Sequence, residues 1–401
     1  MATIRVRRVV GAPVVAVRVW LPGGSGAEAQ PGEAWVGAKL LLEGTRARGW
    51  RAISDQAEAR GMAMGADAGY EAQGLALDAV VDDWELALEW AAELVRDSTF
   101  PEDRCRWIAR RTAAELEQLA DLPDVRTSWA FASQLYGATA RGRPLQGSVE
   151  SLGRMSPRGC RRFHEACLER GIIVSVAGAV DERVVEHKAT DLFGDLPDAP
   201  TSEPVPSRID SASRPRQTIE LDNAAQAQWC GGAVTCPLGD SDYWPLALLG
   251  VVLGAGGALS GRISHRIRER DGLAYDCDVA TVGGAGRGPG CFCVAAGVAR
   301  ERVEEVANVV REELDRVARE GVPAGELTRA TAYVLGRDPF SRETARQQAT
   351  LMAQAELLGL PLDDPGWVRA RWRSVNGPDV RRVAGRYLDP KRLRMTIGKP
   401  S

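Results

Sequence analysis

The stretch SPRGCRRFHEACLERGIIVSVAG, residues 156–178, is echoed by NGPDVRRVAGRYLDPKRLRMTIG, residues 376–398, which begins 220 residues later. Each stretch reads as a turn, a helix of about a dozen residues, a short basic turn and a strand that ends in glycine. Recurrence of the same elements at a fixed separation indicates an internal repeat. The sequence therefore predicts two copies of one structural unit.

Other segments repeat with a similar offset. Residues 81–97 and 300–317 each place apolar side chains along one stripe of a helix. Residues 61–77 and 277–298, which precede these helices, read as pairs of short alternating strands. We therefore predict an α+β fold made of two homologous α/β-sandwich domains, each with a mixed, largely antiparallel sheet and helices packed on one face.

One segment between the two copies has the composition of a linker. Residues 197–217, PDAPTSEPVPSRIDSASRPRQ, are rich in proline, serine and charge and hold few core residues. The predicted organisation is an N-terminal domain at 1–196, a linker at 197–217 and a C-terminal domain at 218–401.

Composition excludes several classes of protein. The net charge is −3, so nothing in the electrostatics favours nucleic acid, and the arginine clusters at 104–111 and 266–270 are expected on solvated helix faces. No apolar run reaches the ~20 residues of a membrane span. The start, MATIRVRRVV, lacks the features of a signal peptide and reads as an edge strand. We expect a cytoplasmic protein with no membrane partner.

Several segments, taken in order, resemble the pitrilysin/insulinase-like zinc metallopeptidases, especially their short, processing-peptidase-like branch. They are LLEGTRARG (41–49), STFPED (98–103), GRPLQGSVESL (142–152) and VVLGAGGALSGRISHRIRERDGLAY (251–275). The last is the most specific, because it keeps a Gly-rich turn, a serine-arginine pair and an Arg-x-x-x-Gly-Leu-x-Tyr pattern. The resemblance covers nearly the whole chain.

Active members of that family carry His-x-x-Glu-His on their first helix. The two histidines bind Zn²⁺ and the glutamate activates the metal-bound water. Counting back from Gly44-Thr45, these positions hold Trp35, Ala38 and Lys39. Indole and ammonium groups offer Zn²⁺ no lone pair, and Ala38 offers no base. The resemblance therefore implies no catalytic residue, no metal ligand and no cofactor in this chain, with zinc expected on a partner subunit.

The family's third zinc ligand is a glutamate further along the chain. Glu115, eight residues before Pro123, falls at that position, and Glu117 is a competitor for it. A glutamate on a charged helix is more often a solvated surface residue, so its survival does not restore a metal site.

The resemblance also implies substrate-binding residues. In the family one half supplies zinc, and the other supplies an arginine and a tyrosine that hold the substrate backbone. The matching residues here are Arg268 and Tyr275, seven positions apart. The alternative is that Arg268 is a surface arginine and Tyr275 a core strand residue. The glycine-rich residues 254–261 are interpreted either as the family's substrate loop or as a plain helix N-terminal turn.

Three functions follow from these observations. The first is a non-catalytic, substrate-binding subunit of a heterodimeric zinc endopeptidase, whose partners are a catalytic subunit of the same family and a peptide. The second is a peptide-binding or scaffold protein without a proteolytic role, and the retained Arg268 and Tyr275 argue against it. The third is an independent metallopeptidase with other ligands, for which the scattered His164, His187 and His265 supply no shared helix face.

Overall fold

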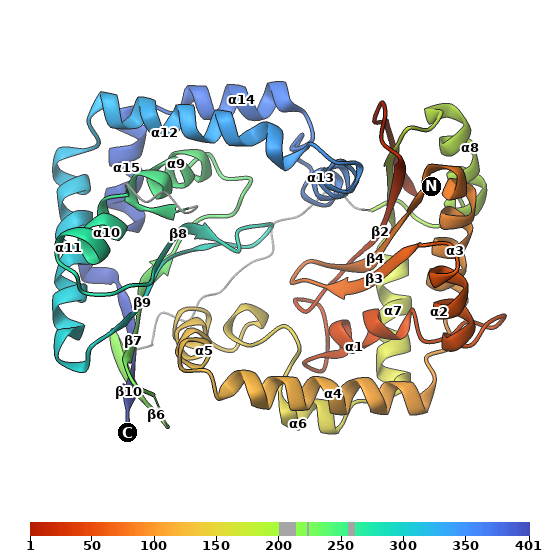
Figure 1. The fold of residues 1–401 in the computed structure, drawn as a ribbon, viewed down its shortest axis with the longest axis horizontal. Coiled ribbons are helices and arrows are strands. Elements are labelled where there is room, and N and C mark those ends of the chain that lie inside the picture. The colour runs from red at the N-terminus through yellow and green to blue at the C-terminus, as the bar shows by residue number, and fades with distance from the viewer. Residues whose placement is uncertain (200–213, 223, 256–260) are drawn as a thin grey trace. The chain divides into compact units, whose positions relative to one another are not determined.

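A computed structural model describes residues 1–199, 214–222, 224–255 and 261–401 (Figure 1). The chain divides into two units, and each unit is built from three separate segments. Unit 1 comprises residues 1–117, 144–202 and 339–365. Unit 2 comprises residues 118–143, 203–338 and 366–401. Most of the predicted linker, residues 200–213, lies outside the described residues.

Unit 1 contains a five-stranded sheet in the order β1-β5-β2-β4-β3. Its strands are β1 (Thr3–Arg8), β2 (Val14–Pro22), β3 (Ala63–Ala68), β4 (Ala72–Val80) and β5 (Ile173–Gly178). β1 runs parallel to β5, and the other neighbours are antiparallel. β2 lies at the centre, and its nearly continuous run of buried residues fits a strand that is covered on both faces.

Unit 2 contains a second five-stranded sheet, in the order β6-β10-β7-β9-β8. Its strands are β6 (Arg216–Leu221), β7 (Ala227–Val234), β8 (Cys277–Gly283), β9 (Cys291–Val298) and β10 (Arg394–Pro400). Numbered within each unit, both sheets follow the order 1-5-2-4-3, and in both the only parallel pair joins the first and fifth strands. The predicted α+β fold with a duplicated, mixed sheet is therefore confirmed, and β1 is the predicted edge strand.

The helices of each unit cover both faces of its sheet, and most of them pack on the same face (Figure 1). Those of unit 1 are α1 (Glu33–Leu40), α2 (Trp50–Glu58), α3 (Trp84–Arg96), α4 (Glu102–Ala120, which runs into unit 2), α6 (Val149–Gly153), α7 (Pro157–Glu169), α8 (Glu182–Phe193) and α13 (Ala345–Leu358). Those of unit 2 are α5 (Pro123–Tyr136), α9 (Tyr243–Leu253), α10 (Arg262–His265), α11 (Val303–Glu320), α12 (Ala324–Arg337), α14 (Pro365–Ser374) and α15 (Gly377–Tyr387).

The opposite face of the first sheet is covered by α13, which comes from the second half of the chain. Its small residues Ala345 and Ala349 pack with Ala16 of β2 and Ala177 of β5. The Ser175 hydroxyl donates a hydrogen bond to the Ala349 carbonyl at 2.7 Å. Small side chains let the helix backbone approach the sheet closely enough for this contact.

The second sheet is covered in the same way by α5, which comes from the first half of the chain. Phe131, Leu135 and Tyr136 pack on Cys230 of β7. A Cβ atom added at Gly398 of β10 would lie only 2.4 Å from the Thr127 hydroxyl oxygen, so the close approach of α5 requires glycine there. Each repeat therefore supplies one helix to the sheet of the other repeat.

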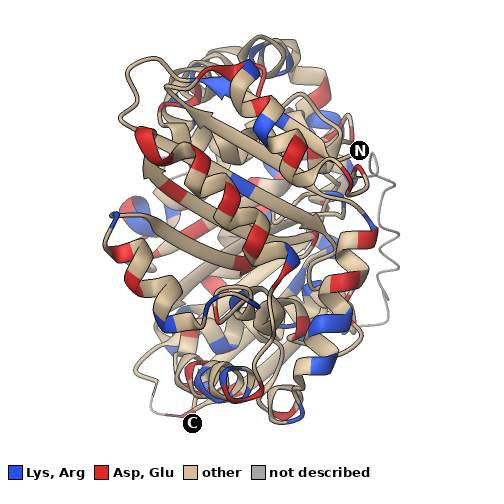
Figure 2. Cartoon of the chain, turned by 90° about the vertical axis from the view of Figure 1, so that its right-hand side faces the viewer, with Lys and Arg blue, Asp and Glu red and all other residues tan. Residues whose placement is uncertain are grey.

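Surface charge is mixed on the face that carries α3 and α8. Figure 2 shows acidic and basic residues interspersed along the helices of this face. Among the described residues, no helix combines the length and apolarity needed to cross a lipid bilayer.

The helix exchange predicts that the first half of the chain does not fold by itself. A fragment of residues 1–199 retains every strand of the first sheet but lacks α13, so the face around Ala16 and Ala177 is exposed to water. We expect this fragment to show no cooperative thermal transition in circular dichroism. Addition of a 214–401 fragment, which carries α13, should restore one. If the 1–199 fragment alone unfolded cooperatively, at a temperature close to the thermal midpoint of the full chain, the first sheet would not depend on α13 and the prediction would be wrong.

Candidate functional site

The helix that resembles a zinc-binding helix is α1, and its three key positions are not equivalent. Ala38 is fully buried, whereas Trp35 and Lys39 are partly exposed on one side of the helix. The Lys39 ammonium lies 4.8 Å from the centre of the Trp35 ring and forms an ion pair with Asp67 of the edge strand β3. The two positions that would hold histidines are therefore neighbours, as the helical spacing requires, but they present a cation and an indole.

The glutamate that matches the third ligand points to solvent. Glu115 lies on α4 and forms an ion pair with Arg111, one turn earlier on the same helix, at 2.8 Å. Glu117 is also exposed. Within the described part of the chain, no group of three or more His, Cys, Asp or Glu side chains is arranged to hold a metal ion. The residues at the expected zinc positions do not fit this metal.

In unit 2 the structure brings the neighbourhoods of Arg268 and Tyr275 together. Arg268 lies in a π-helical turn, η4 (Arg266–Arg270), which continues α10, and Tyr275 lies just before β8. The Arg268 guanidinium donates a hydrogen bond at 3.0 Å to Asp276, the residue that follows Tyr275. The Tyr275 side chain is 98% exposed, so it is not a core residue.

Local backbone geometry explains why the Arg-x-x-x-Gly-Leu-x-Tyr pattern presents a tyrosine to solvent. Gly272 adopts φ +55°, which turns the chain out of the π-helical turn. Leu273 then inserts into the core, and its amide donates to the Ile267 carbonyl at 2.7 Å. With Leu273 buried and the backbone turned, Tyr275 emerges on the outside.

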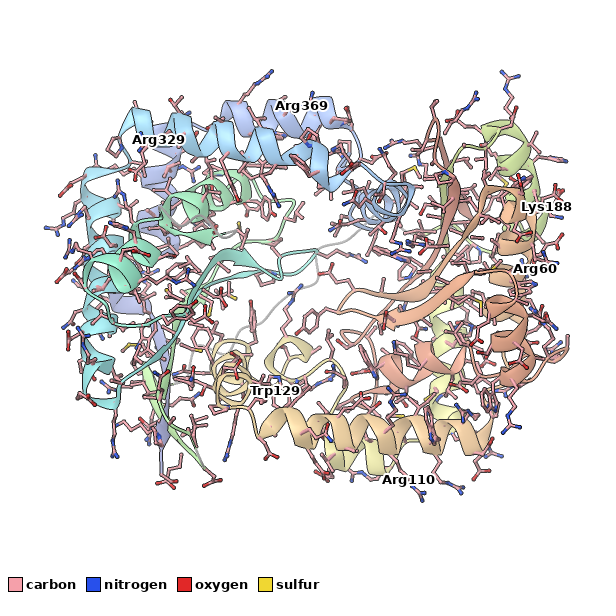
Figure 3. All side chains as sticks on the ribbon, in the orientation of Figure 1. Arg60, Arg110, Trp129, Lys188, Arg329 and Arg369 are labelled. Carbon is pink, nitrogen blue, oxygen red and sulfur yellow. The ribbon has the colours of Figure 1, made fainter. Side chains whose placement is uncertain are left out.

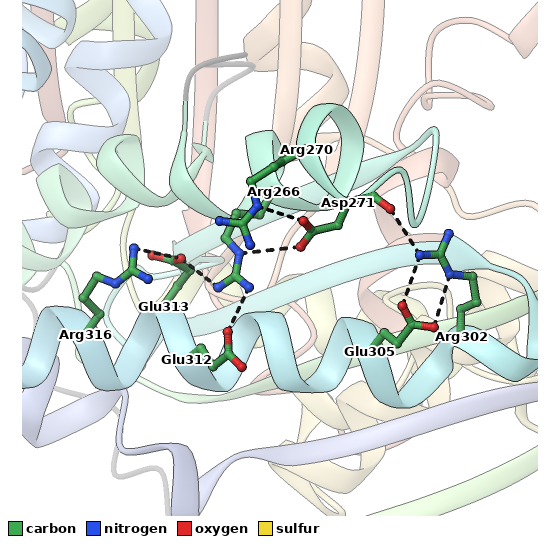
Figure 4. A network of polar contacts seen from close by, with 8 residues as sticks. All are labelled: Arg266, Arg270, Asp271, Arg302, Glu305, Glu312, Glu313 and Arg316. Carbon is green, nitrogen blue, oxygen red and sulfur yellow. Dashed lines mark hydrogen bonds and ion pairs between the residues drawn. The ribbon is translucent and has the colours of Figure 1, made fainter.

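A network of charged groups that the sequence did not reveal lies beneath this turn (Figure 4). Arg266 was expected on a solvated helix face, but its side chain is only 10% exposed and binds Glu313 at 2.9 Å and Glu312 at 2.8 Å. That expectation is wrong for Arg266, because Glu313 on α11 is itself buried and requires a counter-charge. One sequence signal was present, since Glu313 falls on the apolar stripe of α11 between Val310 and Leu314.

Asp271, the residue that follows the π-helical turn, joins this network through ion pairs with Arg266 and Arg270. A hydrogen bond from Arg270 is the largest reason that the pKa of the Asp271 carboxyl lies below its usual value, and the charges of Arg266 and Arg302 lower this pKa further. The carboxylate is therefore ionised at neutral pH and can hold the surrounding arginines.

The other arginine cluster is mixed in character. Arg110 is exposed, and Figure 3 shows it projecting away from α4. Arg104, by contrast, is partly buried, pairs with Glu43 and lies 4.6 Å from the ring centre of Trp50 and 4.4 Å from that of Trp107. The expectation of a solvated face holds for Arg110 and is wrong for Arg104. Of the glycine-rich segment 254–261, residues 256–260 lie outside the described residues.

Comparisons with known proteins find similarity to peptidases. A family profile described as "Peptidase M16 inactive domain" matches residues 161–333. An uncharacterized zinc protease of Streptomyces coelicolor is 28% identical over 369 residues, which cover 90% of this chain and 79% of that protein. Over 90% of its length the chain is similar to a protein named as a zinc protease, and residues 161–333 match the M16 inactive-domain profile. The family resemblance drawn from the sequence is thereby confirmed.

Two solved structures share the fold of this chain. The crystal structure of a peptidase M16 inactive domain from Pseudomonas fluorescens aligns with a TM-score of 0.87 and 20% identity, over 100% of this chain and 96% of that one. A protease from Helicobacter pylori aligns with a TM-score of 0.86 and 16% identity, over 99% of this chain and 96% of that one. At these identities the agreement concerns the fold alone.

The backbone turn before Tyr275 leads to a stability prediction. Gly272→Ala should lower the free energy of unfolding by about 1–2 kcal/mol, because a Cβ atom is disfavoured at positive φ even though open space surrounds the residue. As a control, Gly336→Ala replaces an exposed glycine inside α12 and should raise stability by about 1 kcal/mol. Urea unfolding of both variants measures the change in the free energy of unfolding. Equal changes in the two variants would contradict the conclusion that the positive φ of Gly272 requires glycine.

The substituted helix α1 leads to a metal-binding prediction. We expect the purified chain to carry no stoichiometric zinc and to cleave no peptide by itself, because Trp35 and Lys39 cannot coordinate Zn²⁺. Metal analysis after dialysis measures the zinc content. About one tightly held Zn²⁺ per chain, lost in a Glu115→Gln variant, would overturn this prediction.

Proposed function

We propose that this chain is the non-catalytic, substrate-binding subunit of a cytoplasmic, heterodimeric zinc endopeptidase. In this proposal a partner subunit of the M16 family carries the zinc ion and the general base. The chain described here contributes Arg268 and Tyr275 to the binding of the peptide at the partner's active site.

The observation that carries the proposal is the presentation of Arg268 and Tyr275 at the end of one turn. Tyr275 is almost completely exposed, and Arg268 is held next to its neighbour Asp276. A guanidinium and a phenol are both hydrogen-bond donors, and both can bind a peptide carbonyl. The same donors stabilise the oxyanion that forms when water attacks that carbonyl.

The ion pair with Asp276 leaves Arg268 available to a substrate. The Asp276 side chain is 77% exposed, and a solvent-exposed pair of this kind contributes only about 0–1 kcal/mol. A peptide carbonyl or carboxylate can therefore replace it at small cost.

The assignment of zinc to a partner rests on the donor set of this chain. The similar protein from Streptomyces coelicolor is named a zinc protease. Here Trp35, Ala38 and Lys39 occupy the zinc-helix positions, and Lys39 adds a positive charge there. A metal-dependent reaction that involves this chain therefore needs the metal from another polypeptide.

The alternative is a peptide-binding or scaffold protein of the same fold with no proteolytic role. Such a protein has no need for two donors aimed at a developing oxyanion. The two functions differ in whether substitution of Arg268 or Tyr275 changes a reaction rate or only an affinity.

The proposal predicts a loss of turnover in the assembled enzyme. The partner is obtained by co-expressing this chain with same-genome M16 proteins that carry His-x-x-Glu-His. In the resulting complex, Arg268→Ala or Tyr275→Phe should reduce turnover of an internally quenched peptide by roughly a hundredfold, the usual effect of removing one oxyanion donor. Folding and association should be unchanged.

Arg270→Ala serves as the matched control. Arg270 lies in the same turn and its side chain is exposed, but it binds Asp271 and not Asp276. It should change turnover by less than about threefold, as expected of an exposed pair. Loss of activity traced entirely to a weaker complex would favour the scaffold function, as would a failure to form a complex with any such protein.

A further inference from the structure

The position of Tyr275 depends on its backbone. An exposed side chain makes almost no packing contacts of its own. The position of Tyr275, which precedes the Arg268-bound Asp276, therefore depends on the backbone that leads to it, residues 271–274 of the segment between the π-helical turn and β8.

Arg302 forms hydrogen bonds with the backbone of this segment. It lies in η5 (Arg300–Arg302), immediately before α11. Its two terminal nitrogens donate to consecutive backbone carbonyls, those of Gly272 at 2.9 Å and Asp271 at 3.1 Å, and the bond to Asp271 is drawn in Figure 4. Both carboxylate oxygens of Glu305 accept hydrogen bonds from the same guanidinium, at 3.1 and 3.3 Å, and so fix its orientation.

Arg266 supports the segment from beneath. Its carbonyl accepts a hydrogen bond from the Asp271 amide at 2.9 Å, and its guanidinium is bound to Glu312 and Glu313 of α11. The Glu313 side chain is 1% exposed, so this ion pair cannot be exchanged with water. Arg266 thus holds one end of the segment against α11, and Arg302 binds the carbonyls of the next two residues, Asp271 and Gly272.

We propose that Arg302 is a positioning residue, which holds the Asp271 and Gly272 carbonyls against the start of α11 so that Tyr275 is presented beside Arg268. Its planar fork suits this role, because two parallel N–H groups can bind two neighbouring carbonyls at once. The inference rests on the proposed function for its consequence in peptide binding.

The test compares Arg302→Gln with Arg316→Gln in the full-length chain. Arg316 lies on α11 and pairs with Glu313 at 3.4 Å, and among the described residues no hydrogen bond or ion pair joins it to the segment 271–274. Hydrogen exchange is followed by mass spectrometry on fragments that cover residues 270–277 and 291–298. Arg302→Gln should speed exchange in 270–277 by about tenfold, and Arg316→Gln should not. Strand β9 should be unchanged in both variants.

A second readout is the affinity for a fluorescein-labelled, unstructured peptide, measured by anisotropy on wild type, Arg268→Ala, Arg302→Gln and Arg316→Gln. Arg302→Gln should weaken binding by about tenfold through a looser turn, in the same direction as Arg268→Ala. Unchanged exchange in Arg302→Gln overturns the positioning role, and so does unchanged affinity in a protein that remains sensitive to Arg268→Ala. Binding that is absent or insensitive to Arg268→Ala overturns the proposed function itself, while the exchange data still decide whether Arg302 holds the turn.

Discussion

An open five-stranded sheet has two apolar faces, and both must be removed from water. In this chain most helices of each unit, which alternate with the strands in sequence, cover only one of them. The second face is closed by a single helix, α13 for the first sheet and α5 for the second. The order of the strands, the alanines of α13 and the glycine at position 398 all satisfy this one requirement of close helix-on-sheet contact.

The candidate site contains two kinds of ion pair, one buried and one nearer the surface. Arg266 and Glu313 are buried together, and removal of one partner from such a pair typically costs about 3–5 kcal/mol. Arg268, whose side chain is 28% exposed, pairs with the more exposed Asp276, and a pair at the surface contributes little. The buried pair, Arg266 with Glu313, therefore lies against α11, and the pair of Arg268 with Asp276 lies on the solvent side.

Much of the fold could be predicted from the sequence, because periodicity and repetition are local properties. The apolar stripe of α11, from Val303 to Leu314, is buried as expected, and residues 61–77 contain the expected pair of short strands, β3 and β4. The exchange of α5 and α13 could not be predicted in this way. Periodicity shows that a helix has an apolar side, but it does not show which of two similar sheets receives that side.

The same limit applies to the site. Arg268 and Tyr275 were found through a short pattern that matches a family. Arg266 was misread because its charge was judged by residue type alone, and its partner Glu313 lies 47 positions away. A single acidic residue on an otherwise apolar helical stripe was the available signal, and it points to a buried ion pair only once the facing element is known.

The helix exchange also has an evolutionary consequence. A duplicated half that loses its metal chemistry would ordinarily be free to drift or disappear, because selection on catalysis no longer acts on it. Here the first half contributes α5 to the sheet of the second half, so its deletion would expose one face of that sheet. Substitutions such as Lys39 can accumulate on the surface of α1, while the scaffold around them remains under selection for packing. A half that performs no chemistry of its own can thus be retained because the fold of the other half depends on it.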